Sequence, residues 1–247
     1  MIRVSLPKLE IAVSTVEMLR AELQGAAAPR REDHPESMTH SGRRELWNVG
    51  RHFIVSRCRQ LLTDGASPQP LQPSCDEYDV VTRNGLGRGT QPRIYLRGQM
   101  LPWRLSLSHT DRMLALGISH ERHSRVGVDL VDPAELNSGA LQMWCTPRER
   151  TAIENLGLEA FARIWGMKEA LYKAVNYGEP FCPLNFEIDV ESNPVSCRWR
   201  GVPLPLDIAW TRHLPEGGYV AAVAISDFPR CLRARLTHSN STYSVCN

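Results

Sequence analysis

The chain has 247 residues, of which 42% are hydrophobic and 23% are charged. This is the ordinary balance of a globular protein, and the length allows one or two domains. The net charge of +2 is too small to indicate nucleic-acid binding by itself. No run approaches the roughly 20 apolar residues that span a bilayer, and the N-terminal segment lacks the apolar stretch of a signal peptide. The seven cysteines lack the paired spacing of a zinc or disulfide framework. We therefore expect a cytoplasmic protein.

The first half of the chain is expected to combine short strands with a long, arginine-rich helix. The elements predicted here are, in chain order, strands at 3–6 and 11–13, helices at 14–24 and 43–62, and strands at 103–107 and 113–119. The segment 26–41 is predicted to be a loop, and 63–74 and 85–92 are glycine- and proline-containing loops.

The second half is expected to begin with a strand and continue with helices. Its predicted elements are a strand at 125–131, helices at 134–144, 147–156 and 159–177, strands at 185–190, 195–199, 206–210 and 218–226, and a basic tail from 229. Each half carries a long helix followed by short strands. This order favours an α+β fold of two similar halves, residues 1–122 and 123–247.

An unusual acid lies in the strand predicted at 125–131. Strand alternation places Gly127, Asp129 and Val131 on one face and the apolar residues 126, 128 and 130 on the other. Asp is disfavoured among aliphatic strand residues, and a buried carboxylate needs a partner such as a metal ion. An Asp that caps a neighbouring turn is an equally good interpretation of this motif alone. Asp132 precedes a proline and has a complete explanation as a helix cap.

A second motif lies in the helix predicted at 159–177. Trp165, Glu169 and Lys173 are spaced by four and share one helix face. A Glu four residues before a Lys is often only a solvent-exposed ion pair. The tryptophan on the same face indicates that this face is partly buried.

Three further segments have residue types that can bind phosphate or act as acids. Ser108 and His109 directly follow the strand predicted at 103–107. A hydroxyl and an imidazole clustered at a strand end can contact phosphate, although an ordinary turn histidine is an alternative. Backbone amides of the loop Gly85–Gly89 can approach a phosphate, although a mobile loop is an alternative. Thr146 and Glu149 form a capping box, with Glu149 kept as a candidate functional acid.

Taken in order, these segments resemble the 4′-phosphopantetheinyl transferases of the surfactin-synthetase-activating type. The family carries a Gly-Ile/Val-Asp strand followed by Trp-x-x-Lys-Glu-x-x-x-Lys, matched here by Gly127–Asp129 and Trp165–Lys173. A Ser-His at a strand end is matched by Ser108 and His109, and a basic loop that ends in proline is loosely matched by Arg88–Pro92.

The resemblance implies two halves related by a pseudo-twofold axis, with the active site in the cleft between them. It implies that a monomer transfers 4′-phosphopantetheine from coenzyme A to a serine of an apo acyl or peptidyl carrier protein, with 3′,5′-ADP released. Asp129 and Glu169 would hold Mg²⁺, Lys173 would neutralise or protonate the leaving phosphate, and Glu169 or a metal-held water would be the base. The residues implied to contact coenzyme A are Arg44, Arg88, Ser108, His109, Lys168 and Lys173.

One position departs from the family, and it keeps a second interpretation open. Many members carry a second acid two residues after the strand Asp, where this chain has Val131. Two protein carboxylates and extra water still suit Mg²⁺, which usually keeps several waters. The departure also motivates an alternative: a coenzyme A-binding protein that has lost transferase activity. The arginine-rich helix 43–59 suggests nucleic-acid binding, but it lacks the interleaved exposed aromatics expected of a base-stacking surface.

Overall fold

The computed structural model describes residues 1–24, 41–64, 74–83, 89–137, 139, 141–175 and 180–226. For residues 41–44, 83, 89 and 90 it describes only the backbone. No helix in these ranges is both long and apolar enough to cross a membrane.

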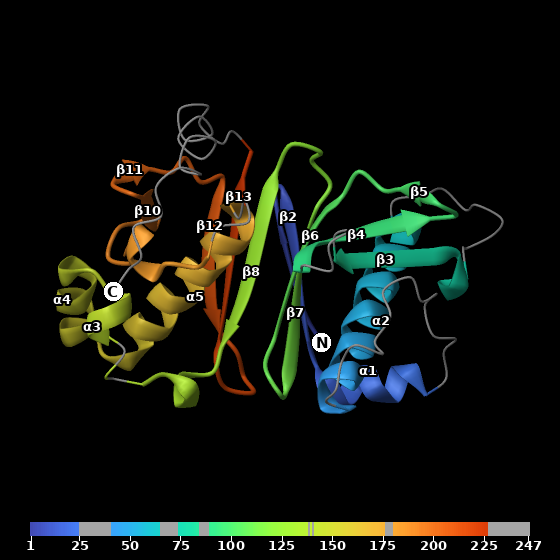
Figure 1. The fold of residues 1–247 in the computed structure, drawn as a ribbon, viewed down its shortest axis with the longest axis horizontal. Helices are drawn as coiled ribbons and strands as arrows, with labels where there is room; N and C mark the ends of the chain where they lie inside the picture. Colours follow the sequence, from blue (N-terminus) through green and yellow to red (C-terminus); the bar gives the residue numbers. More distant parts are fainter. Residues whose placement is uncertain are drawn as a thin grey trace.

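A four-stranded antiparallel sheet forms the centre of the N-terminal half (Figure 1). Its order is β1 (Ile2–Leu6), β2 (Leu9–Thr15), β7 (Met113–Ser119) and β6 (Arg104–His109). Helices α1 (Val16–Leu23) and α2 (Ser41–Asp64) pack against one face of it. A smaller sheet of β3 (Tyr78–Arg83), β4 (Gly89–Leu96) and β5 (Gln99–Met100) follows the 3₁₀ turn η2 (Cys75–Glu77).

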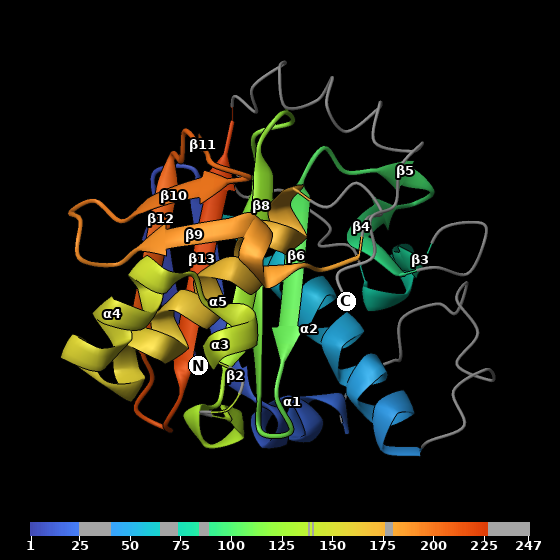
Figure 2. The ribbon, with the colours of Figure 1, turned by 60° about the vertical axis from the view of Figure 1, so that its left-hand side comes forward.

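A three-stranded antiparallel sheet forms the centre of the C-terminal half. Its order is β12 (Ile208–His213), β13 (Tyr219–Ile225) and β8 (Arg125–Val131). Helix α5 (Leu158–Val175) packs on β8 and β13, and α3 (Leu141–Trp144) and α4 (Pro147–Leu156) lie beside it (Figure 2). The remaining elements are the 3₁₀ turns η3 (Pro133–Glu135) and η5 (Pro183–Asn185) and the sheet of β9 (Phe186–Asp189), β10 (Ser196–Trp199) and β11 (Val202–Pro203).

The two central sheets pack face to face, and strand alternation explains how. On β13, Val220, Ala222 and Ala224 join an apolar cluster with residues of β2 and β8 between the sheets. The intervening residues of β13 face α5 instead. Because both faces of β7 and β13 are covered, these strands are buried along their whole length and read as continuous apolar runs. The edge strands β6 and β8 lie side by side where the sheets meet.

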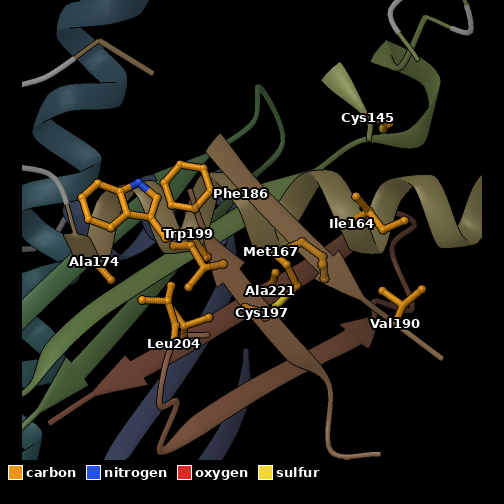
Figure 3. Close-up of a cluster of buried hydrophobic side chains, with 14 of the residues drawn as sticks. Cys145, Ile164, Met167, Ala174, Phe186, Val190, Cys197, Trp199, Leu204 and Ala221 are labelled. Atoms are coloured by element: carbon orange, nitrogen blue, oxygen red, sulfur yellow. The ribbon is translucent and has the colours of Figure 1, made fainter. Parts of the chain in front are cut away.

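Helix α5 has its own core on the side away from the N-terminal half. Figure 3 shows Ile164, Met167 and Ala174 of α5 gathered with side chains of the β9–β11 sheet, including Phe186 and Trp199. Burial of several large apolar side chains, each worth about 1.5–3 kcal/mol, fixes the rotation of α5 about its axis. The rotation decides which residues of α5 face β8.

The mixed helix-and-sheet class predicted from the sequence is confirmed, with some differences in its elements. The helix predicted at 134–144 is wrong: the chain forms η3 and the short α3 instead. Asn137 Oδ1 accepts the Gly139 amide at 2.8 Å, a local turn that competes with helix formation. Strand β3 was missed, and β4 begins inside the predicted loop 85–92. The loop predicted at 26–41 lies largely outside the described residues. The pseudo-twofold relation and the cleft stay predictions.

Candidate functional site

The site begins with a close contact between β8 and α5. A Cβ atom at position 127 would lie 1.7 Å from the carbonyl oxygen of Ala170, so only glycine allows α5 to approach so closely. Two residues further along β8, Asp129 is buried on the same face and meets Lys173. The strand parity predicted from the sequence is therefore confirmed, since Gly127 and Asp129 face α5 while Val126 and Val128 face the other sheet.

Three polar side chains from three elements meet at this contact. The ammonium of Lys173 lies 2.7 Å from Asp129 Oδ1 and 3.0 Å from Ser108 Oγ. The Ser108 hydroxyl donates to Asp129 Oδ1 at 2.8 Å. Lys173 also donates to the Val128 carbonyl at 3.1 Å. The structure thus brings together Ser108 of β6, Asp129 of β8 and Lys173 of α5, which are far apart in the sequence.

Glu169 adds a second carboxylate beside this cluster. Burial, and then the negative charge of Asp129, raise the pKa of Glu169 to about 7, while Lys173 acts in the opposite direction. One ammonium therefore stands against two carboxylates. Once Glu169 is ionised, above a pH of about 7, the site carries excess negative charge, and a cation would stabilise it.

His109 lies at the exposed end of β6, next to Ser108. Neighbouring protein atoms partly desolvate the imidazole and so lower the pKa of His109. The positive charge of Lys173 lowers it further, while Asp111 and Asp129 act in the opposite direction. The imidazole is therefore neutral at pH 7 in the absence of a bound anion. An anion bound nearby would favour its protonation.

The donor set fits a hard divalent cation such as Mg²⁺. Asp129 Oδ1 is held by Ser108 and Lys173, and no group in the described part of the chain bonds its other oxygen, Oδ2. Oδ2 and the Glu169 carboxylate are the oxygen ligands that Mg²⁺ prefers. The described residues contain no group of three acidic, His or Cys side chains placed to hold a metal. The two-carboxylate cation site stays a prediction.

Val131 fills its position with apolar packing. It is buried with Ala162 and Tyr219, and it lies close to Gly166 of α5. A Cβ atom on Gly166 would come within 3.0 Å of a Val131 methyl group. An acid at this position would face an apolar wall.

Lys168, predicted to contact coenzyme A, lies in a different environment. Its side chain is fully buried, and its ammonium donates to Glu149 at 2.7 Å, to the Trp144 carbonyl at 2.7 Å and to the Pro183 carbonyl at 3.1 Å. All three N–H donors of the ammonium are used by protein acceptors. Lys173 also has three protein acceptors, but its side chain is 26% exposed, whereas that of Lys168 is fully buried. Because the Lys168 ammonium is closed off from any ligand in this conformation, we leave it out of the proposed site. Glu149 completes the capping box with Thr146, as predicted, and is equally buried.

The side chains of two further residues predicted to contact coenzyme A, Arg44 and Arg88, are not among those that the structure describes. Arg88 lies outside the described residues, and only the backbone of Arg44 is described, within α2. Asp132 caps η3 through the Ala134 amide, as its capping pattern predicted. It also pairs with Arg112.

Sequence reasoning missed Gln91 of β4. Its amide donates to the carbonyls of Val126 at 3.0 Å and Lys173 at 2.6 Å, and so ties β4 to β8 and to the end of α5. Its uncharged amide gives no sequence signal for such a contact. The binding and catalytic roles of the predicted residues stay predictions.

Comparison with known proteins agrees with the resemblance at a coarse level. Residues 125–224 match the family model of the 4′-phosphopantetheinyl transferase superfamily. The matched segment contains β8 and α5, and with them Asp129, Glu169 and Lys173. The match supports a phosphopantetheinyl transferase, but it does not distinguish the surfactin-synthetase-activating type. No curated protein matches the chain in sequence.

Proposed function

We propose that this protein is a 4′-phosphopantetheinyl transferase of the surfactin-synthetase-activating type. It transfers the phosphopantetheine group of coenzyme A to a serine of an apo acyl or peptidyl carrier protein. The observation that carries the proposal is the meeting of Asp129, Glu169 and Lys173 on the facing surfaces of β8 and α5. These three residues lie inside the segment that matches the superfamily model.

The reaction breaks a phosphoanhydride bond of coenzyme A and forms a phosphoester bond to the carrier serine. The carrier serine oxygen forms a bond to the β-phosphorus of the coenzyme A pyrophosphate, and the bond from this phosphorus to the bridging oxygen breaks. The bridging oxygen leaves as part of 3′,5′-ADP, and the serine proton must go to a base. Phosphoryl transfer of this kind needs mainly positioning and stabilisation of negative charge.

The residues of the site can supply these needs. Asp129 and Glu169 would hold Mg²⁺, which when bound neutralises pyrophosphate charge and makes phosphorus a better electrophile. Glu169 is also the candidate base for the serine proton. The Lys173 side chain is 26% exposed, so its ammonium can place positive charge beside the leaving phosphate. His109 is exposed beside the cluster and can donate to a phosphate once protonated.

The direct test is transfer to a panel of apo carrier proteins in the presence of coenzyme A and Mg²⁺, followed by intact mass of the carrier. We expect the wild-type protein to load at least one carrier. Asp129→Ala and Glu169→Ala should each abolish loading, because each removes half of the protein ligands for the cation.

The matched control is Asp132→Asn. Asp132 follows the same strand, but it caps η3 and pairs with Arg112, so its loss should leave loading near the wild-type rate. Full carrier loading by Asp129→Ala or Glu169→Ala would overturn the proposed mechanism.

A specific observation also favours the second candidate, a coenzyme A-binding protein without transferase activity. Val131 is buried among apolar residues at the position where many family members have an acid. Coenzyme A binding by calorimetry, without a magnesium-dependent mass gain on any carrier, would favour this candidate over the transferase.

A further inference from the structure

The two central sheets are joined at their edges by serine side chains. Strands β6 and β8 are each the last strand of their own sheet, so the amides of β8 that point away from β13 need acceptors from elsewhere. The Val128 amide donates to Ser106 Oγ at 3.0 Å, and the Leu130 amide donates to Ser108 Oγ at 3.2 Å. Both serines are buried, with exposed fractions of 2% and 6%. Their hydroxyls thus act as acceptors in place of a neighbouring backbone.

Only one of these two serines also touches the site. Ser108 donates its proton to Asp129 Oδ1 and accepts from the Lys173 ammonium, in addition to the Leu130 amide. A hydroxyl has one donor and two acceptor positions, and these three bonds use them all. No bonding capacity is left for a phosphate oxygen, so the structure does not support the predicted contact between Ser108 and coenzyme A.

We propose that Ser108 is a positioning residue that holds the Asp129 carboxylate and the Lys173 ammonium in register. Because Ser108 and Lys173 both bind Oδ1 of Asp129, the carboxylate keeps one orientation and presents Oδ2 to a cation. The anchor of Ser108 is the Leu130 amide in the backbone of β8, so the orientation is set by the joint between the sheets. The inference rests on the proposed transferase function where transfer is the readout, and on the proposed cation site where Mn²⁺ binding is the readout.

A serine beside a lysine can also be a nucleophile activated by a base, and this arrangement differs from one. Both lone pairs of Ser108 accept protein hydrogen bonds, and the residue is only 6% exposed. The Ser108 proton goes to Asp129, away from the lysine. Ser108 therefore orients other groups and does not attack a substrate.

The chain offers a matched pair of variants for the test. Ser108→Ala and Ser106→Ala each remove one buried hydroxyl and leave one β8 amide without its acceptor, so both should lower the melting temperature, and Ser108→Ala at least as much as Ser106→Ala. Ser108→Ala alone also removes a bond to Asp129 and a bond to Lys173. Ser108→Thr restores the hydroxyl on a strand that tolerates β-branched residues.

Two measurements separate positioning from a structural or ligand-binding role. Binding of Mn²⁺, followed by electron paramagnetic resonance with saturating coenzyme A, should weaken about 10–100-fold in Ser108→Ala, as expected when a residue that orients a metal ligand is removed. It should stay within about twofold of wild type in Ser106→Ala, with partial recovery in Ser108→Thr. Carrier loading by Ser108→Ala should show a similar fall in kcat, with KM for coenzyme A nearly unchanged.

Three results would contradict the role of Ser108 or the proposed function, and they can be told apart. Equal effects of the two alanine variants on Mn²⁺ binding and on kcat would show a merely structural role and overturn the proposal. A rise in KM for coenzyme A with kcat preserved would mean that Ser108 binds the substrate directly, and would also overturn it. Absence of loading by the wild-type protein would overturn the proposed function, while the Mn²⁺ comparison would still decide the role of Ser108.

Discussion

Two lysines of helix α5 each pair with a carboxylate, but the surroundings of the two pairs differ. Lys168 and Glu149 are fully buried, and each charged group has several protein partners. Glu149 accepts the Thr146 and Ile188 amides in addition to Lys168, so one positive charge meets one negative charge in a saturated network. Such a network joins α4, α5 and β9 and leaves no free position for a ligand.

The second pair, Lys173 and Asp129, lies near the surface and is not balanced. The Lys173 side chain is 26% exposed, and Glu169 adds a second carboxylate to the same group. Oδ2 of Asp129 has no hydrogen bond from the described residues. A buried pair with equal opposite charges and fully hydrogen-bonded oxygens therefore indicates a structural role. A pair with an additional carboxylate and an unbonded oxygen indicates a site for a further cation.

The largest expected loss of stability comes from breaking the balanced pair of Lys168 and Glu149. Lys168→Met should destabilise the protein by about 3–5 kcal/mol, because it leaves the Glu149 charge buried without its partner. Urea unfolding at pH 7 measures the change. Adding Glu149→Gln should restore part of the loss, since the amide oxygen can still accept a backbone N–H. A cost for Lys168→Met that is no larger than that of Lys173→Met would contradict the comparison.

A smaller loss of stability is expected at the unbalanced pair. Lys173→Met should cost roughly 1–2 kcal/mol, because water can reach part of the site and replace the ammonium. The transfer rate should nevertheless fall by about 10²–10³-fold, as when a group that stabilises transition-state charge is lost. Unfolding and carrier loading are measured on the same preparation. Loading at the wild-type rate would remove Lys173 from the mechanism.

The sequence was sufficient to predict the two faces of β8 and the placement of Glu169 and Lys173. Strand alternation has a fixed period of two, so Asp129 had to share a face with Gly127. Helical spacing likewise placed Glu169 and Lys173 on one side of α5. These are local geometric rules, and they hold whatever the rest of the chain does.

The role of Lys168 could not be predicted in the same way. It is adjacent to Glu169 in the sequence, and only the packing of α3 and α4 around α5 shows that it is buried against Glu149 and the Trp144 carbonyl. The alternating serines of β6 were visible in the sequence, but which backbone amides donate to them depends on how the two sheet edges meet. Long-range packing decides such contacts, and a single sequence carries no local signal for them.

The smallest expected change in stability tests directly whether two carboxylates face one ammonium at the Lys173 site. The pKa of Glu169 is raised from 4.5 to about 7 in the folded protein. The folded state therefore favours the protonated form, and this contribution to stability is present below pH 4.5 and is lost as the pH rises through about 7. Glu169→Gln, which cannot ionise, should be more stable than wild type at pH 8 by about 1 kcal/mol, after allowance for partial exposure.

Unfolding in the presence of EDTA at pH 5 and pH 8 measures this difference, with the exposed Glu154→Gln of α4 as the control. The gain should grow with pH for Glu169→Gln and stay near zero for Glu154→Gln. Excess Mg²⁺ with coenzyme A should reverse the order at pH 8, since only the wild-type carboxylate can bind the cation and ligand binding stabilises the folded state. Equal stability of Glu169→Gln and wild type at every pH would mean that ionised Glu169 does not destabilise the folded protein. The two lysine pairs would then differ only in their solvent exposure.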